Sequence, residues 1–185
     1  MTVPVHSLNS THRELLKRHF SELADEDVRL RFGSTINRDA RNAYVDAISF
    51  ERDAVFGVYA DNLSLLGVAH LACFRGAAEL GLSVLAPYRG HGIGTALFQR
   101  GAMHARNLQI CELFMNCLAQ NGAILHIARK AGMRIVVEQA GVDAYLELPP
   151  GNPLTFGQEM VEQELAIFDW TLKANVESMR RMTQR

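Results

Sequence analysis

Hydrophobic residues near the start of the chain follow first a strand pattern and then a helical one. A short strand is expected at residues 3–8. After it, apolar residues recur every three or four positions, which is the spacing of one helix face; they are Leu15, Leu16, Phe20 and Leu23. Thr11 and Glu14 could form a capping box, in which each side chain satisfies the other's free backbone N–H. The pattern therefore predicts a capped helix directly after the strand.

Two more helices are expected before the pattern changes. The segment LADEDVRLRFG, residues 23–33, predicts a short helix that ends at Gly33. The acidic run ELADED, residues 22–27, is expected to be a solvated helix face. Asn37 is placed to cap a third helix, because its side-chain oxygen can accept from the first free N–H groups.

The middle of the chain changes to residues that favour strands. AVFGVYA (residues 54–60) and LSLLGVAHLACF (63–74) are joined by Asp61-Asn62, which predicts a hairpin. AAELGLSVL (77–85) is expected to be the next strand. Its alternation is imperfect, so we expect either burial on both faces or a bulge.

Helices and strands alternate through the following residues. Helices are expected at residues 92–106 and 121–132, and Gly132 is a suitable stop. Strands are expected in LQICELFMNCL, RIVVEQ and DAYLELP, with Ala140-Gly141 as the turn between the last two. The chain is therefore predicted to be α/β, with about seven strands and flanking helices.

Pro149-Pro150-Gly151 interrupts the pattern, and a long helical segment follows. One apolar stripe runs along that helix; it consists of Val161, Leu165, Phe168, Leu172, Val176 and Met179. The stripe could pack on the protein's own domain, or it could form a homodimer. We therefore expect one domain at residues 1–150 and a C-terminal helical extension at residues 151–185.

Composition narrows the classes of partner. The chain has 185 residues with a formal net charge of -1, so no basic field favours nucleic acid or an acidic membrane surface. We expect no transmembrane segment or signal peptide. Cys73, Cys111 and Cys117 lack the spacing of a zinc site or a disulfide framework, and reduced thiols fit the cytoplasm. The histidines show no metal-ligand spacing either, so no metal is expected.

The segment YRGHGIGTAL, residues 88–97, lies between a predicted strand and a predicted helix. The first N–H groups of a helix lack intrahelical partners, and the helix dipole adds partial positive charge there. Glycines let the backbone approach an anion closely, and Arg89 adds a cation that can bind phosphate. This combination favours a phosphate-binding loop, although a plain tight turn would have similar residues.

Two familiar phosphate loops do not match this segment. A Walker A loop requires a lysine after its last glycine, and Ile93-Gly94-Thr95 offers none. A Rossmann fingerprint requires G-x-G-x-x-G, whereas Gly90, Gly92 and Gly94 are spaced G-x-G-x-G.

The sequence RGHGIG, which contains Arg89, Gly90, Gly92 and Gly94, resembles the acyl-CoA pyrophosphate loop of the GNAT acetyltransferases. The segment NGAILHIARKAGM is similar to a second signature of that family, with Met133 in place of phenylalanine. The order of elements from residue 2 to about residue 148 matches as well. The resemblance implies the GNAT acyl-CoA N-acyltransferase fold, in which the sheet is mixed and mostly antiparallel.

A narrower resemblance is to the GNAT domains of bacterial protein-lysine acetyltransferases. The segments that carry it are LADEDVRLRF, the pair Ala78-Glu79 and IARKAGM. The resemblance implies transfer of an acetyl group from acetyl-CoA to an amine, such as a protein lysine, by direct attack in a ternary complex. The thioester is already activated, so no metal is required.

The resemblance also assigns roles to residues. Glu79 becomes the candidate general base, although an ordinary surface glutamate would fit the strand equally. A bulge in that strand would separate it from its neighbour and leave backbone groups for the pantetheine. The residues expected to contact coenzyme A are Leu82, Ser83, Val84, Arg89, Gly90, His91, Gly92, Ile93, Gly94, Thr95 and Asn121. Asn121 could equally be a simple helix N-cap.

One departure from the family leaves the chemistry incomplete. Many GNAT enzymes have a tyrosine that protonates the leaving thiolate, and Ala128 stands at that position here. The remaining candidates for the general acid are Ser83, Cys117, His126 and Tyr145, or the thiolate leaves unprotonated. Two alternatives to a protein acetyltransferase therefore stay open: an acetyltransferase of small amines, and a non-catalytic acyl-CoA sensor.

Overall fold

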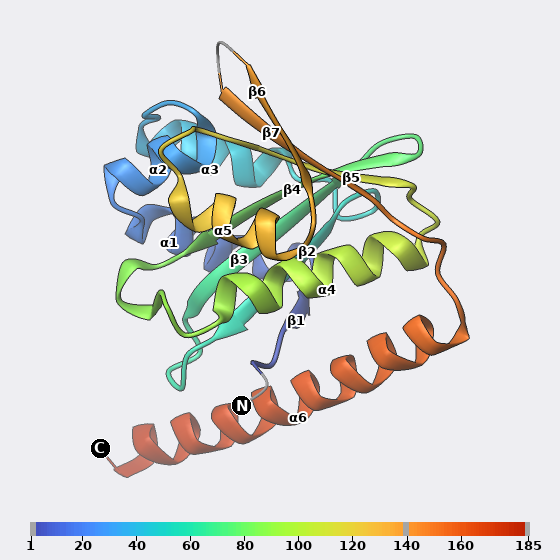
Figure 1. Ribbon diagram of the computed structural model, residues 1–185. Coiled ribbons are helices and arrows are strands. Elements are labelled where there is room, and N and C mark those ends of the chain that lie inside the picture. The colour runs from blue at the N-terminus through green and yellow to red at the C-terminus, as the bar shows by residue number, and fades with distance from the viewer. Residues whose placement is uncertain (1–2, 139–140, 184–185) are drawn as a thin grey trace.

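The structure, a computed structural model, describes residues 3–138 and 141–183. Its described part contains one seven-stranded sheet with the order β1-β2-β3-β4-β5-β7-β6 (Figure 1). The strands are β1 (His6–Leu8), β2 (Ala54–Tyr59), β3 (Leu65–Cys73), β4 (Ala77–Val84), β5 (Glu112–Cys117), β6 (Arg134–Glu138) and β7 (Gly141–Glu147). The helices are α1 (Arg13–Glu22), α2 (Asp25–Phe32), α3 (Arg38–Ala47), α4 (Ile93–Asn107), α5 (Gly122–Lys130) and α6 (Pro153–Thr183), with short 3-10 turns η1 (Ser10–His12) and η2 (Ala86–Tyr88).

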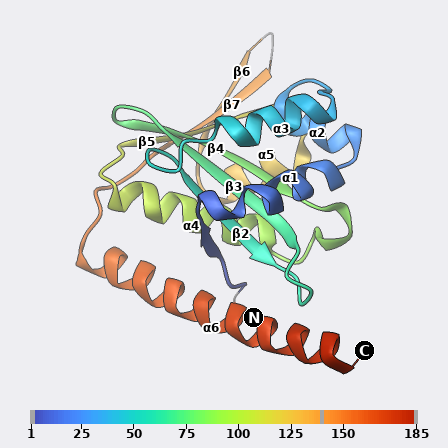
Figure 2. The ribbon, with the colours of Figure 1, turned by 180° about the vertical axis from the view of Figure 1, so that it is seen from behind.

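The helices cover both faces of the sheet. Helices α4 and α5 lie on one face, where Leu80 of β4, Leu97 of α4 and Leu113 of β5 belong to one buried cluster (Figure 1). Helices α1, α2 and α3 lie on the other face, where Phe20 and Val45 belong to a second cluster (Figure 2). The predicted α/β class and the mixed, mostly antiparallel sheet are confirmed.

The centre of the sheet contains one short parallel pair. Strands β4 and β5 pair only from Ala77↔Glu112 to Glu79↔Phe114. Beyond Glu79 the two strands separate, while β4 keeps its pairing with β3 and β5 keeps its pairing with β7. The expected bulge in this strand is wrong, because the β3–β4 register is unbroken from Gly67↔Val84 to Cys73↔Ala78. Each strand is held on its outer side, so the pair can open without an inserted residue.

The early helix boundaries follow the sequence closely, with one exception. Helix α2 ends at Gly33, whose φ of 76° is left-handed, and the Asn37 side chain accepts a hydrogen bond from the Ala40 N–H. The Thr11–Glu14 capping box is wrong. Asn9 is the cap instead: its side chain accepts from the Thr11 N–H at 3.0 Å, and its own N–H donates to the His12 ring at 3.1 Å. The chain makes the turn η1 first, so the first free N–H groups lie further upstream than the pattern suggested.

Helix α6 runs along the outside of the domain beside α4 and β1 (Figures 1 and 2). Polar residues make the contact. Glu159 pairs with Arg100 at 2.7 Å and with His104 at 2.6 Å, and Lys173 donates to the Tyr59 carbonyl at 2.9 Å. Burial alone would raise the pKa of Glu159, but the hydrogen bonds from His104 and Asn107 and the Arg100 charge lower it to about 2.

The predicted apolar stripe of this helix points away from the domain. All six of its residues are 45–64% exposed. The expectation that the stripe packs on its own domain is therefore wrong, because ion pairs and hydrogen bonds on the opposite side hold the helix.

The turn predicted at Ala140-Gly141 lies partly outside the described residues. The predicted boundary between the domain and the C-terminal helical extension, at residue 150, stays a prediction.

His19 connects α1 to the sheet. Its Nδ1 lies 3.0 Å from the Leu65 carbonyl oxygen, and its Nε2 lies 2.8 Å from the Ser83 hydroxyl. A carbonyl only accepts, so Nδ1 carries the proton and the Ser83 hydroxyl donates to Nε2. Burial lowers the pKa of His19 to about 4, so the ring is neutral at neutral pH.

We predict that His19 makes the protein less stable in mild acid. In the unfolded chain the ring takes up a proton near pH 6.5, whereas in the folded protein it does so only near pH 4. The free energy of unfolding should therefore fall by up to about 3 kcal/mol as the pH drops through this interval. Urea unfolding between pH 7 and pH 4 should show a smaller loss for His19→Asn than for the wild type. Equal losses would contradict this role.

Candidate functional site

Two cavities lie where β4 and β5 separate. The first, which we call the loop cavity, has a volume of about 440 Å³ and lies between the end of β4, the glycine-rich loop and the starts of α4 and α5. The second, which we call the Glu79 cavity, has a volume of about 490 Å³ and is lined by Glu79, Tyr44, His70 and residues of β5 and β7. Leu30 and Arg31 at the end of α2 line both cavities. The two spaces therefore meet at α2.

The glycine-rich loop has the geometry that an anion site needs. Gly90 and Gly92 have φ of 78° and 82°, and a Cβ added at either would meet nothing within 4 Å. Glycine is therefore needed at these positions for the backbone conformation. Gly92 caps α4, so the N–H groups of the first helical turn have no intrahelical partner. At Gly94 a Cβ would lie 3.1 Å from the end of the Ile127 side chain, which would have to shift to make room for it.

Arg89 lies beside this loop and is already held by two contacts. Its Nε donates to the Val84 carbonyl at 3.1 Å, and its Nη2 lies 2.6 Å from the Asp27 carboxylate. The Asp27 side chain is only 12% exposed, so this end of the acidic run is not the solvated face that we expected. The pair connects α2 to the glycine-rich loop across the loop cavity. A cofactor phosphate would bind next to a guanidinium that is fixed in place.

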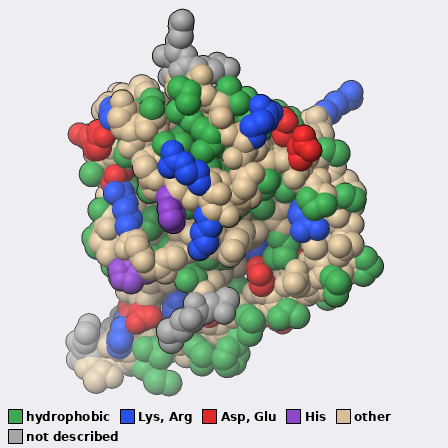
Figure 3. All heavy atoms as spheres, in the orientation of Figure 1, with side chains coloured by type: hydrophobic (Ala, Val, Ile, Leu, Met, Phe, Trp, Pro, Cys, Tyr) green, Lys and Arg blue, Asp and Glu red, His purple; other side chains and the backbone are tan. Residues whose placement is uncertain are grey.

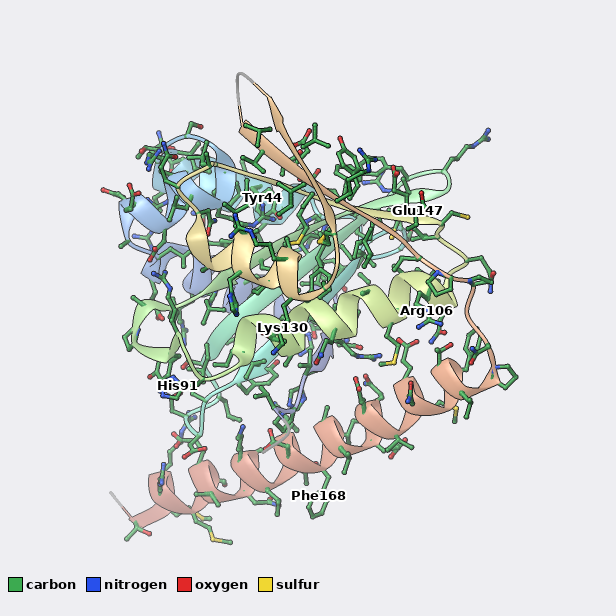
Figure 4. The ribbon with its side chains drawn as sticks, viewed as in Figure 1. Tyr44, His91, Arg106, Lys130, Glu147 and Phe168 are labelled. Atoms are coloured by element: carbon green, nitrogen blue, oxygen red, sulfur yellow. The ribbon has the colours of Figure 1, made fainter. Side chains whose placement is uncertain are left out.

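The structure brings together most of the residues predicted to bind coenzyme A. The loop cavity is lined by Leu82, Ser83, Val84, Arg89, Gly90, Gly92, Ile93, Gly94, Thr95 and Asn121. His91 is exposed, does not line the cavity and lies at the outer end of the loop (Figure 4). The cavity's glycine loop and open strand edge fit a long ligand with a phosphate group at one end.

Two of these side chains already have protein partners. The Ser83 hydroxyl donates to His19, so β4 presents its backbone to the cavity at this position. Asn121 caps α5, because its Oδ1 accepts from the Ile124 N–H at 3.2 Å, and its amide donates to the Leu30 carbonyl at 3.4 Å. Asn121 therefore connects α5 to α2 at the junction of the cavities.

Beyond Glu79, β4 has no strand partner on the β5 side in the described chain, so its backbone groups there can bind a ligand.

A chain of hydrogen bonds positions Arg31 at the junction. Its Nη2 donates to the Tyr44 hydroxyl at 3.0 Å, and that hydroxyl lies 2.7 Å from His70 Nδ1. His70 Nε2 lies 3.4 Å from the Asp53 carboxylate. With the His70 proton on Nε2, each group donates to the next from Arg31 to Asp53. Tyr44, which is labelled in Figure 4, belongs to α3.

The guanidinium of Arg31 lies directly against β4. A Cβ at Gly81 would collide with it, so this strand position must be glycine for the arginine to lie there. Among the described residues, Arg31 has no ion-pair partner within 4.0 Å. Burial raises the pKa of Tyr44 and lowers that of His70, so both are neutral and the positive charge stays on Arg31. The junction therefore contains a positioned cation that forms no direct ion pair within the described residues.

The Glu79 cavity also contains carboxylates. Glu79 lies on β4 two residues before Gly81, and Asp143 of β7 lines the same space. The Glu79 charge is close enough to contribute to the raised pKa of Tyr44, after burial as the main cause. This cavity can attract an ammonium group and accept a proton from it.

The four residues predicted as candidates for the general acid lie in different surroundings. The Ser83 hydroxyl is used by His19, and the Tyr145 hydroxyl donates to Asp143 at 3.2 Å. Cys117 lines the Glu79 cavity, where burial raises the pKa of its thiol, and His126 is exposed at the loop cavity. The group that lies at the junction is Arg31, which the sequence did not single out.

The described residues contain no group of three metal-ligating side chains, and none of the described helices is long and apolar enough to cross a membrane.

The chain is similar to known proteins in its family pattern and in its fold. The family model described as "Acetyltransferase (GNAT) domain" matches residues 8–134. No curated protein gave a significant sequence match. The GNAT domain of S. lividans PAT superposes with a TM-score of 0.68 at 16% identity, covering 80% of this chain and 95% of that chain.

Two other solved structures are similar in fold. The ribosomal-protein-alanine N-acetyltransferase from Brucella melitensis has a TM-score of 0.63 at 17% identity and covers 78% of this chain and 99% of its own. The putative acetyltransferase yncA from Salmonella typhimurium, solved with acetyl-CoA, has a TM-score of 0.61 at 15% identity, with coverages of 82% and 97%. At these low identities the superpositions show a common fold only, whereas the family model matches more than half of the sequence. The chain therefore belongs to the GNAT family of acetyl-CoA-dependent N-acetyltransferases.

Proposed function

We propose that this protein moves the acetyl group of acetyl-CoA to an amine by direct attack within a ternary complex, with Glu79 as the general base. One observation carries the proposal. The loop cavity and the Glu79 cavity meet at Arg31, beside the point where β4 separates from β5. One cavity suits a phosphate-bearing thioester and the other suits an ammonium group, so the two reactants can meet without a covalent enzyme intermediate.

The loop cavity holds the donor. Acetyl-CoA supplies an activated thioester. The N–H groups from Gly90 to Thr95 and the Arg89 guanidinium bind its pyrophosphate, and the free edge of β4 from Leu82 to Val84 binds the pantetheine amides. Asn121 keeps α5 at the correct distance from α2 through its contact with Leu30.

Glu79 takes the proton that the amine must lose. An ammonium ion cannot attack a carbonyl carbon, so the carboxylate accepts one proton, directly or through one water molecule. The amine nitrogen then forms the new C–N bond, the C–S bond breaks, and the sulfur leaves with its electron pair. The nitrogen loses its second proton as the intermediate collapses, and that proton goes to the leaving sulfur, directly or through water. The products are the acetylated amine and coenzyme A, and the proton on Glu79 returns to solvent.

Arg31 takes the place of the missing tyrosine. A guanidinium does not give up its proton near neutral pH, so its contribution is electrostatic. Placed against Gly81, it stabilises the negative charge that develops as the thioester reacts and the thiolate leaves. The Tyr44–His70–Asp53 chain holds it in that position without neutralising it.

The acceptor we propose is a lysine side chain of a protein. Glu79 and Asp143 would attract its ammonium group. A small amine is the second candidate, because a cavity of about 490 Å³ can enclose a whole small molecule.

We expect the reaction in the cytoplasm, where the three free cysteines would stay reduced. A homodimer is also part of the proposal, and it depends on α6 rather than on these cavities.

Glu79→Gln should abolish most turnover and leave acetyl-CoA binding intact. Loss of a general base typically costs about 10²–10⁴-fold in rate. Release of coenzyme A would be measured against a panel of lysine peptides, protein N-termini and small amines, and acetyl-CoA affinity by calorimetry. Glu147→Gln is the matched control, because Glu147 is an exposed strand glutamate of β7 that lines neither cavity (Figure 4). Acetyl-CoA binding by a wild type that turns over no amine would instead indicate an acyl-CoA sensor.

Arg31→Gln should lower kcat by about 10²–10³-fold, the usual effect of removing one positioned electrostatic contact. Arg31→Lys should recover part of this loss, because it restores the charge without the planar guanidinium. Arg29→Gln is the control: Arg29 lies on the same helix and pairs with Glu26 at 2.7 Å on the surface. If the Arg29 and Arg31 variants lost the same activity, Arg31 would only support the structure of α2.

A further inference from the structure

A row of aromatic side chains continues from Glu79 across the surface of the sheet. Glu79 of β4 is the register partner of Phe114 of β5, and Phe114 is the partner of Tyr145 of β7. Register partners on neighbouring strands point to the same side of a sheet, so these three side chains lie in line. The rings of Phe74 and Phe114 stack at 6.4 Å, and those of Phe114 and Tyr145 lie 6.2 Å apart. We call the three rings the aromatic row.

The aromatic row lies outside the cavities and beside the helices. Leu113, Met115 and Ala144, which alternate with its residues, belong to the core cluster of α4, so the row faces the other side of the sheet. On that side α1, α2 and α3 cover the earlier strands, while β6 and β7 project past them (Figure 2). None of the three rings lines either cavity, and Phe74 is 56% exposed. The row is thus a surface next to the place where the acceptor amine would react.

Carboxylates border the aromatic row. Glu112 lies two positions before Phe114 on β5, and Asp143 lies two positions before Tyr145 on β7. Alternate residues of a strand share one side of the sheet, so both carboxylates lie on the same side as Glu79. Among the described residues, none of these three carboxylates has an ion-pair partner within 4.0 Å. The surface around the rings therefore attracts positive charge.

The opposite side of the sheet has basic groups instead. Arg129 and Lys130 lie in the last turn of α5, and Figure 3 shows Lys and Arg side chains over this helix. Charge is thus divided between the two sides of the sheet. A basic segment of another molecule is drawn to the side of the aromatic row and repelled by the side of α5.

The charge of Glu112 does not stabilise the sheet. Its register partner on β7 is Glu147, and like charges directly opposite each other on neighbouring strands destabilise a sheet. Glu147 is exposed to solvent, whereas Glu112 is half-buried beside the rings. Sequences accept local costs of this kind chiefly at functional sites. The position of Glu112 therefore supports a role in binding.

Two arginines show what kind of group the rings accept. Arg134 of β6 stacks on the Tyr145 ring at 5.1 Å, and Arg75 lies exposed in the turn between β3 and β4. The exposed Phe74 ring offers the same cation–π contact to a residue of another molecule. An uncharged apolar segment would remove water from the carboxylates without pairing them, which is costly. A segment with Lys or Arg pairs with the carboxylates and stacks on the rings.

We propose that Phe74, Phe114, Tyr145 and Glu112 form a docking face for an extended, lysine- and arginine-rich segment of the acceptor protein. The inference rests on the proposed function, and it selects acceptor lysines that have basic neighbours. Residues of an extended chain advance by about 3.3 Å each, and neighbouring strands lie about 4.8 Å apart. When the acceptor lysine reaches Glu79, residues two or three positions away would lie over β5 and β7.

Binding of a peptide that cannot react tests the docking face apart from the chemistry. The probe is a fluorescent peptide with norleucine in place of the acceptor lysine and arginines on both sides. Its partner has glutamates instead of the arginines. Fluorescence anisotropy should show wild-type protein binding the arginine peptide about tenfold more tightly or better, the effect of a few exposed ion pairs. Equal affinity for the two peptides would overturn the proposal.

Charge reversal at one residue locates the binding. Glu112→Lys should remove most of the preference for the arginine peptide and leave circular dichroism unchanged, because the lysine would face Glu147 as an opposite charge. Glu164→Lys is the matched control, since Glu164 is an exposed glutamate of α6. An equal loss in both variants would mean that overall charge attracts the peptide, and the docking face would be wrong.

Turnover separates this inference from the proposed function. With acetyl-CoA and an arginine-flanked lysine peptide, Phe74→Ala should raise KM about two- to fivefold, the usual effect of one exposed cation–π contact, rather than lower kcat. The control is Leu108→Ala, which removes another apolar side chain that is 50% exposed. Peptide preference without any turnover would support the docking face and reject the proposed function. Turnover with the same KM for arginine-flanked and glutamate-flanked peptides would do the reverse.

Discussion

The separation of β4 from β5 after Glu79 creates the space on which the rest of the site depends. Both strands are central, and each keeps its pairing on the outer side, so the sheet stays intact while a gap opens between them. The open edge of β4 leaves backbone groups available inside an otherwise continuous sheet. Glu79 is the last residue of β4 that still pairs with β5, and the glycine-rich loop follows the far end of the strand.

Helix α2 makes this opening into one site. Asp27 holds Arg89 at the loop, the Leu30 carbonyl accepts from Asn121, and Arg31 lies against Gly81. Three positions on one side of a single helix thus contact the phosphate loop, the start of α5 and the centre of β4. Movement of α2 would change both cavities together, so it would couple the proposed donor site to the proposed acceptor site. The proposed chemistry depends on this helix as much as on the glycine loop.

The sequence was informative where the signals are local. Helix periods, the stop at Gly33, the Asn37 cap and the glycine-rich loop each depend on a few neighbouring residues, and the structure has them as expected. The Arg31–Tyr44–His70–Asp53 chain joins two helices, a strand and a loop, so no local pattern contains it. Periodicity also identified the apolar face of α6 but could not tell which way it points. That direction is set by Arg100 and His104, about sixty residues earlier, which bind Glu159.

The most direct test of the central claim is thermal unfolding with and without saturating acetyl-CoA. A ligand at about 100 times its dissociation constant adds roughly 2.7 kcal/mol to the free energy of unfolding. For a chain of 185 residues this corresponds to a rise in Tm of roughly 5–10 °C. Such a rise, reduced when Arg89 is replaced by alanine, is what a working loop cavity predicts. A folded protein whose Tm does not change would mean that the glycine loop is only a turn, and the account of the site would fail.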